Sequence, residues 1–136
     1  MDIEELYKKA KEASENSYSP YSRFRVGAAL LSSDEEIFTG TNVENRSFGL
    51  TICAERSALV SAVARGKTRF KALFVYCPDA ESPVSPCGAC RQVISEFVPE
   101  DFPVIFRDKN GKTVKTTMGE LFPYDSLHDL ANRDSM

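Results

Sequence analysis

The sequence predicts a single α/β domain in which helices cover one mixed sheet. The chain has 136 residues, of which 42% are hydrophobic and 27% charged, so its size and composition are those of one globular domain over residues 1–136. Its apolar patterns run in the order helix, hairpin, and then alternating strands and helices. That order favours a mixed sheet covered by helices.

The first half of the chain predicts a helix, a hairpin and a second helix. Apolar residues recur at helical spacing behind Asp2, a suitable N-cap, and Pro20 lies in the segment that ends this first helix. Two short strands joined by a turn favour a hairpin, and a helical pattern that ends at Gly66 follows. The predicted ranges are a helix at 2–16, strands at 24–31 and 36–42, and a helix at 51–65.

The second half alternates between strands and helices. A nearly continuous apolar run predicts a strand that is buried on both faces. The next helix has Ser85 as its expected cap and Pro86 at its expected first position, and Asn110-Gly111 predicts a later hairpin turn. The predicted ranges are a strand at 70–77, a helix at 87–97, strands at 103–107 and 112–116, and a short helix at 118–121.

Composition and charge exclude several classes of partner. Seventeen Lys and Arg against twenty Asp and Glu give a net charge of −3, whereas a polyanion binder carries a basic surface. We therefore expect no polymeric nucleic acid as a partner. No apolar run approaches the roughly 18 residues of a membrane span, so we expect no membrane partner. The acidic N-terminus lacks the features of a signal peptide, which predicts a cytoplasmic protein with reduced cysteines.

The cysteine spacing is the strongest chemical signal in the sequence. Cys87 and Cys90 form a C-x-x-C motif at the predicted start of a helix, where free amides and the helix dipole stabilise thiolates. Cys53 lies at the start of the preceding predicted helix. If both helices begin at the same edge of the sheet, three thiolates meet with one coordination position open. That arrangement is typical of a catalytic zinc, whereas four protein ligands make a closed structural site.

Other interpretations of the cysteines stay open on the residues alone. A redox dithiol has the same C-x-x-C spacing, and a structural zinc could take Cys77 as a fourth ligand. Cys77 ends an apolar strand, however, and unpaired cysteine is among the most buried residue types, so we expect it in the core. The single histidine, His128, is expected in a surface position near the C-terminal tail and is a poor candidate for a catalytic triad.

One acidic residue lies inside the cysteine motifs. Glu55 follows Cys53 by two positions and is the candidate for proton transfer. Residues i and i+2 lie about 200° apart around a regular helix, so these two side chains would normally point in different directions. They can face one site if Cys53 lies at the N-terminal end of the helix, before its first regular turn. The sequence therefore predicts a helix that begins within a residue or two of Cys53.

Two segments carry a family resemblance, TICAER at 51–56 and SPCGACRQ at 85–92. They closely resemble the small homotetrameric cytidine deaminases, and the resemblance covers most of the chain, from residue 18 to residue 121. It implies an α/β/α sandwich with a mixed, roughly five-stranded sheet and one Zn²⁺ per subunit. It also implies zinc-dependent hydrolysis of cytidine and 2′-deoxycytidine to uridine and 2′-deoxyuridine, with release of ammonia, in pyrimidine salvage. By resemblance the residue roles are zinc ligation by Cys53, Cys87 and Cys90, proton transfer by Glu55 and compensation of thiolate charge by Arg56.

The resemblance further implies a small-molecule nucleoside as the substrate. Asn42 and Glu44 are expected to bind the ribose hydroxyls, and Phe24 is expected to pack against the base. The backbone at Ala54 and Ser85 is expected to read the edge of the pyrimidine. Polar groups paired to ribose hydroxyls would discriminate strongly between a nucleoside and a free base.

The assembly and the substrate each leave an alternative. In a homotetramer of this family neighbouring subunits complete each pocket, often with an aromatic residue near the C-terminus. The sequence departs from the usual Ala-Phe-containing stretch there, so Phe122 or Tyr124 would take that place. One alternative function is a related aminohydrolase that acts on another cytosine nucleoside, such as blasticidin S. Another is a non-enzymatic binding module with a structural zinc.

Overall fold

The computed structural model describes residues 1–127 and 130, and the elements occur in the predicted order. His128 lies outside the described residues. In chain order the elements are α1 (Ile3–Ser14), β1 (Gly27–Ser32), β2 (Ile37–Thr41), a 3₁₀ turn (Phe48–Leu50), α2 (Ala54–Ala64), β3 (Phe70–Tyr76), α3 (Gly88–Ser95), β4 (Pro103–Arg107), β5 (Thr113–Thr117) and α4 (Met118–Leu121). Across this part of the chain, no helix is both long and apolar enough to cross a lipid bilayer.

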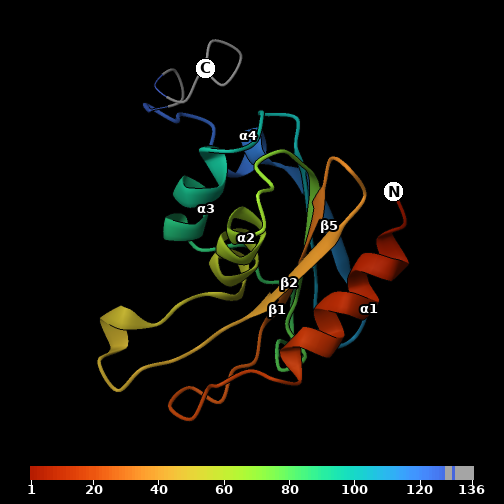
Figure 1. Ribbon diagram of the computed structural model, residues 1–136. Helices are drawn as coiled ribbons and strands as arrows, with labels where there is room; N and C mark the ends of the chain where they lie inside the picture. The colour runs from red at the N-terminus through yellow and green to blue at the C-terminus, as the bar shows by residue number, and fades with distance from the viewer. Residues whose placement is uncertain (128–129, 131–136) are drawn as a thin grey trace.

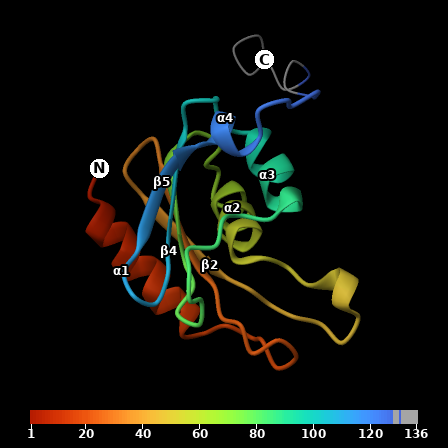
Figure 2. The same cartoon turned by 180° about the vertical axis from the view of Figure 1, so that it is seen from behind.

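The five strands form one mixed sheet in the order β2-β1-β3-β4-β5. Helix α1 lies against one face of the sheet, and α2 and α3 lie against the other (Figure 1 and, from behind, Figure 2). This arrangement confirms the predicted α/β/α sandwich. The two predicted hairpins are also confirmed, because β1 and β2 pair antiparallel, as do β4 and β5.

Strand directions explain why the two cysteine-bearing helices begin side by side. Strands β2 and β3 both pair antiparallel to β1, so they run in the same direction and end at the same edge of the sheet. Helix α2 follows β2 and helix α3 follows β3. Both helices therefore begin near that edge, where sheets of this kind commonly place their ligand sites.

Side chains of the central strands alternate between two hydrophobic clusters. On β1, Ala28 and Leu30 pack on the side of α2 and α3, whereas Ala29 and Leu31 pack on the side of α1. The alternation is the period-2 pattern of a strand covered on both faces. It accounts for the continuous apolar runs of β1 and β3, which are buried along almost their whole length.

Two glycines allow the helices to touch the sheet at backbone distance. A Cβ atom on Gly27 would lie 1.8 Å from the carbonyl oxygen of Ala10 in α1. One on Gly40 would lie 2.3 Å from the amide nitrogen of Ala58 and 2.5 Å from the carbonyl oxygen of Ala54, both in α2. Glycine at position 40 therefore sets how closely the N-terminal half of α2 approaches β2.

The helix ends confirm two predicted caps and correct a third. Asp2 accepts a hydrogen bond from the backbone N–H of Glu5, and Gly66 has φ +84° just after α2. The prediction for α3 was wrong: its N-cap is Cys87, its first residue is Gly88, and no side chain caps it. Ser85 instead accepts a hydrogen bond from the guanidinium of Arg91, which holds the loop outside the helix.

Candidate active site

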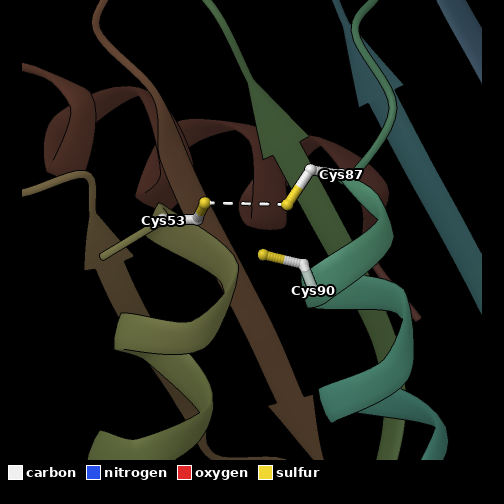
Figure 3. A group of neighbouring side chains, drawn as sticks. All are labelled: Cys53, Cys87 and Cys90. Carbon is white, nitrogen blue, oxygen red and sulfur yellow. Dashed lines mark hydrogen bonds between the residues drawn. The ribbon is translucent and has the colours of Figure 1, made fainter. Parts of the chain in front are cut away.

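Three cysteine sulfur atoms meet where α2 and α3 begin. Cys53 is the N-cap of α2 and Cys87 is the N-cap of α3, and Cys90 lies one turn further along α3. Figure 3 shows their side chains pointing toward one another from the two helices. The three Sγ atoms lie within 4.8 Å of one another, and those of Cys53 and Cys87 are 3.8 Å apart. The prediction that the two helix starts bring three thiols together is confirmed.

The sulfur geometry fits a tetrahedral zinc ion. Zn–S bonds of about 2.3 Å at tetrahedral angles place neighbouring sulfur atoms about 3.8 Å apart, as the Cys53 and Cys87 Sγ atoms are. Neither N-cap cysteine makes a side-chain capping hydrogen bond, so both sulfur atoms are available as ligands. The four cysteines of the chain are all free thiols.

Negative charge is stabilised at this cluster. The pKa of Cys53 is lowered to about 5, first because the Cys90 thiol donates to its sulfur and then because Arg56 lies close. Nη2 of Arg56 is 3.5 Å from Sγ of Cys53. The pKa of Cys90 is raised, because its proton is held by that hydrogen bond and because the residue is buried. A divalent cation would allow all three sulfur atoms to bind as thiolates.

Helix α2 begins at the point that allows Cys53 and Glu55 to face the same site. Its first residue is Ala54, and the turn at Phe48–Leu50 is a separate 3₁₀ element. Glu55 is 5% exposed, and its burial raises its pKa to about 7, with a further contribution from the charge of Cys53. A carboxyl group with a pKa near neutrality can both accept and deliver a proton.

A cavity of about 180 Å³ opens beside the thiol cluster. It is lined by Val26, Asn42, Thr51, Cys53, Ala54, Glu55, Val75, Cys77, Val84, Ser85 and Cys87. Apolar walls with a few polar groups are typical of small-molecule sites. The cavity thus brings the carboxyl group, two of the thiols and the free amides of the first turn of α2 to one space.

The residues predicted to bind substrate divide into two groups. Asn42, Ala54 and Ser85 line the cavity, whereas Phe24 and Glu44 do not. Glu44 accepts hydrogen bonds from the backbone N–H groups of residues 21 and 22 and from the Ser22 hydroxyl. Its carboxylate therefore holds the loop that precedes β1.

Asn42 ties the same loop to the cavity wall. Its side-chain oxygen accepts from the hydroxyl of Ser17 and the N–H of Val26, and its Nδ2 donates to the carbonyl of Phe24. The residue is 8% exposed. In this chain, Asn42 is thus both a lining residue and the anchor of the segment that contains Phe24.

Cys77 does not belong to the thiol cluster. Within the part of the chain that the structure describes, the side chains placed to share a metal are those of Cys53, Cys87 and Cys90. Cys77 is 1% exposed in the larger hydrophobic cluster, and burial raises its pKa to about 12. The expectation that it belongs to the core is confirmed, and the cluster retains three sulfur ligands.

Sequence reasoning missed the role of Arg91. Its guanidinium contacts Ser85, Pro86 and the carbonyl of Leu121, and so connects the cavity wall to the end of α4. The position of Arg91 in the sequence indicates that its side chain can reach this loop. Arg91 stands four residues after Cys87, one helical turn away, so a long side chain there lies near the loop that precedes the helix.

The two C-terminal aromatic residues have different surroundings. Phe122 is partly buried and packs against the larger hydrophobic cluster. Tyr124 is 92% exposed. Of the two, Tyr124 is therefore the side chain that is available to a neighbouring molecule.

Comparisons with known proteins identify the family to which the chain belongs. A family model described as the cytidine and deoxycytidylate deaminase zinc-binding region matches residues 1–106. The cytidine deaminase of Sporosarcina psychrophila is 50% identical over 123 residues, which cover 90% of each chain. The crystal structure of the cytidine deaminase from Burkholderia pseudomallei superposes with a TM-score of 0.86 at 44% identity, and covers 90% of this chain and 98% of that one.

A relative with a different named substrate is more distant. The blasticidin-S deaminase of Bacillus cereus is 37% identical over 108 residues, which cover 74% of this chain and 76% of that one. The relatives at higher identity and the family model favour the cytidine branch over this alternative. On its sequence, its fold and the arrangement of its cysteines, this chain belongs to the cytidine deaminase family.

Proposed function

We propose that this protein is a zinc-dependent cytidine deaminase. It hydrolyses cytidine and 2′-deoxycytidine to uridine and 2′-deoxyuridine: one water molecule replaces the 4-amino group, which leaves as ammonia. The observation that carries the proposal is the cluster of Cys53, Cys87 and Cys90 beside a cavity that the buried Glu55 lines together with two of these cysteines. The activity belongs to pyrimidine salvage, and we assign it to one catalytic domain over residues 1–136.

The three cysteines would hold one zinc ion per chain. Such an ion, when bound, lowers the pKa of a water molecule and so supplies a nucleophile near neutral pH. Three thiolates around a divalent cation carry a formal charge of −1. Arg56, 3.5 Å from the sulfur of Cys53, and the free amides at the starts of α2 and α3 offset this charge.

Glu55 transfers the protons of the reaction. It accepts both protons of the attacking water in turn, the first as the water attacks C4 and the second from the 4-hydroxyl group that results. It delivers the first to the ring nitrogen N3 and the second to the 4-amino group, which leaves as ammonia. Its position in the cavity wall next to Cys53 supports this role, as does its burial, which excludes water from around the carboxyl group.

The nucleoside is bound by residues that line the cavity and by residues at the neighbouring loop before β1. The amide of Ala54 and the carbonyl of Ser85 read the pyrimidine edge, and Asn42 binds a ribose hydroxyl; all three residues line the cavity. Glu44 binds the ribose as well, and Phe24 packs against the base. Their connection to the cavity runs through the loop before β1, which Asn42 and Glu44 both hold.

Four chains assemble into a homotetramer, and Tyr124 helps to complete a neighbouring pocket. The cavity of about 180 Å³ in one chain is smaller than the roughly 300–1,000 Å³ of typical small-molecule sites. Several large apolar side chains are exposed, including Phe48 at 74% and Leu50 at 66%, as is common where subunits meet. The four free cysteines suit a reducing compartment such as the cytoplasm.

The test is a substrate panel followed by ultraviolet absorbance and by ammonia release. Cytidine and 2′-deoxycytidine are expected to react, and cytosine is expected to react at least about 100-fold more slowly, because the groups that bind ribose would be left without partners. Blasticidin S serves as the comparison for the alternative substrate. Faster turnover of blasticidin S than of cytidine would overturn the proposal, as would no turnover of any compound by folded, zinc-loaded protein.

A further inference from the structure

One side chain, Arg91, contacts three separate acceptors through three nitrogen atoms. Nε donates to the carbonyl of Pro86 at 2.8 Å, and Nη2 donates to the hydroxyl of Ser85 at 2.9 Å. Nη1 donates to the carbonyl of Leu121 at 2.7 Å. A guanidinium holds its five N–H donors in a rigid plane, so it can fix acceptors on several sides at once.

Two of these hydrogen bonds fix the peptide between Ser85 and Pro86. Ser85 lines the cavity, and Pro86 is fully buried. The carbonyl of Ser85 belongs to the peptide group that joins these two residues. Because Arg91 holds the Ser85 hydroxyl on one side of this peptide and the Pro86 carbonyl on the other, it restricts how the Ser85 carbonyl can turn.

The third hydrogen bond connects this wall of the cavity to the C-terminal turn. Leu121 is the last residue of α4, and its carbonyl is one of the helix-terminal acceptors that arginine side chains often bind. Phe122 follows and packs against the core, and the exposed Tyr124 lies two residues beyond. A displacement of the turn at 121–124 would therefore pull directly on Arg91.

We infer that Arg91 is a positioning residue that holds the base-binding wall at Ser85 and couples it to the C-terminal turn. The inference rests on the proposed function, in which the backbone of Ser85 reads the pyrimidine edge. Its role is separate from that of Arg56, which contacts the sulfur of Cys53. Loss of Arg91 therefore weakens nucleoside binding and leaves the zinc ligands in place.

The test replaces Arg91 with lysine, which keeps the charge but cannot reach three acceptors. For Arg91→Lys the KM for cytidine is expected to rise about 10- to 100-fold, the effect usual for residues that orient a binding group, with a smaller change in kcat. Zinc content stays at one per chain. Hydrogen exchange measured by mass spectrometry speeds up together in peptides that span 84–90 and 119–124.

Two further variants separate positioning from a general loss of stability. Ser85→Ala removes one of the three hydrogen bonds and is expected to raise the KM less than Arg91→Lys does. It also carries the test if Arg91→Lys fails to fold. The matched control is Arg65→Lys, because Arg65 is largely exposed and its ion pair with Glu36 is 3.7 Å long. The control is expected to change neither the KM nor the exchange rates.

Several results would overturn the inference. One is a KM that stays unchanged in Arg91→Lys and Ser85→Ala while only the melting temperature falls. Faster exchange at 84–90 with unchanged exchange at 119–124 would contradict the coupling to the C-terminal turn. If the wild-type protein does not deaminate cytidine, the proposed function and the base-positioning role fail together, whereas the exchange experiment still tests whether Arg91 bridges the two segments.

Discussion

Glu55→Gln is expected to lower the kcat for cytidine by roughly 100- to 10,000-fold, the usual contribution of a general acid and base. Glutamine keeps the shape of the side chain but can neither accept nor deliver the protons of the reaction. The fold and the zinc content should persist, because Glu55 lies outside the three-sulfur cluster and its burial as a carboxylate is itself unfavourable. The measurement is the decline in cytidine absorbance under saturating substrate, with bound zinc counted in the same sample.

The matched control for this variant is Glu12→Gln on α1. Glu12 is an exposed carboxylate on the helix that covers the opposite face of the sheet. The kcat of the Glu12→Gln variant should therefore equal that of the wild type. A Glu55→Gln protein that keeps more than a tenth of the wild-type kcat would contradict a role of Glu55 in proton transfer. So would an activity that falls only in proportion to lost zinc, because Glu55 would then support the metal site and not the proton transfers.

Gly40→Ala is expected to weaken both the fold and the zinc site. The new Cβ would lie 2.3 Å and 2.5 Å from backbone atoms of α2, which cannot move aside without the helix. The free energy of unfolding should fall by about 2–3 kcal/mol or more, at or beyond the upper end of ordinary overpacking. Because Cys53 is the N-cap of α2, a shift of the helix also moves its sulfur away from the other two, and zinc affinity should fall about 10- to 100-fold.

Denaturant titration of zinc-saturated protein and competition with a chelator measure the two effects separately. Gly27→Ala is the control for overpacking, because its Cβ would meet the backbone of α1 on the opposite face of the sheet. It should destabilise the fold and leave the zinc affinity of the folded protein unchanged. Gly49→Ala meets no atom within 4 Å and should change neither quantity. Unchanged zinc affinity in a destabilised Gly40→Ala protein would show that α2 does not position Cys53.

The order of elements and the thiol cluster could be predicted because local patterns carry both. Apolar periodicity separates helices from strands, and the spacing of Cys53, Cys87 and Cys90 relative to two helix starts indicates the metal site. The start of α2 at Ala54 could be predicted for a different reason. Cys53 and Glu55 lie two residues apart, and both can face one cavity only if Cys53 lies at the N-terminus of the helix.

Features that depend on distant parts of the chain could not be predicted in the same way. Ser85 has the residue type of a helix cap, but the guanidinium of Arg91 binds its hydroxyl, and α3 begins later. The closeness of Gly40 to α2 depends on how the helix packs across the sheet. Phe24 lies outside the cavity because of the path of the loop before β1, and Glu44, just after β2, binds the backbone of that loop; no local pattern specifies either feature.

The three-cysteine site is expected to carry zinc and, with the metal bound, to deaminate cytidine. The most direct measurement is to remove the metal with a chelator, return zinc in steps, and record cytidine turnover by ultraviolet absorbance at each step. Turnover is expected to rise in proportion to added zinc and to reach a plateau at one zinc per chain. Folded protein that binds one zinc per chain and leaves cytidine unchanged would contradict the account, as would turnover that does not depend on zinc.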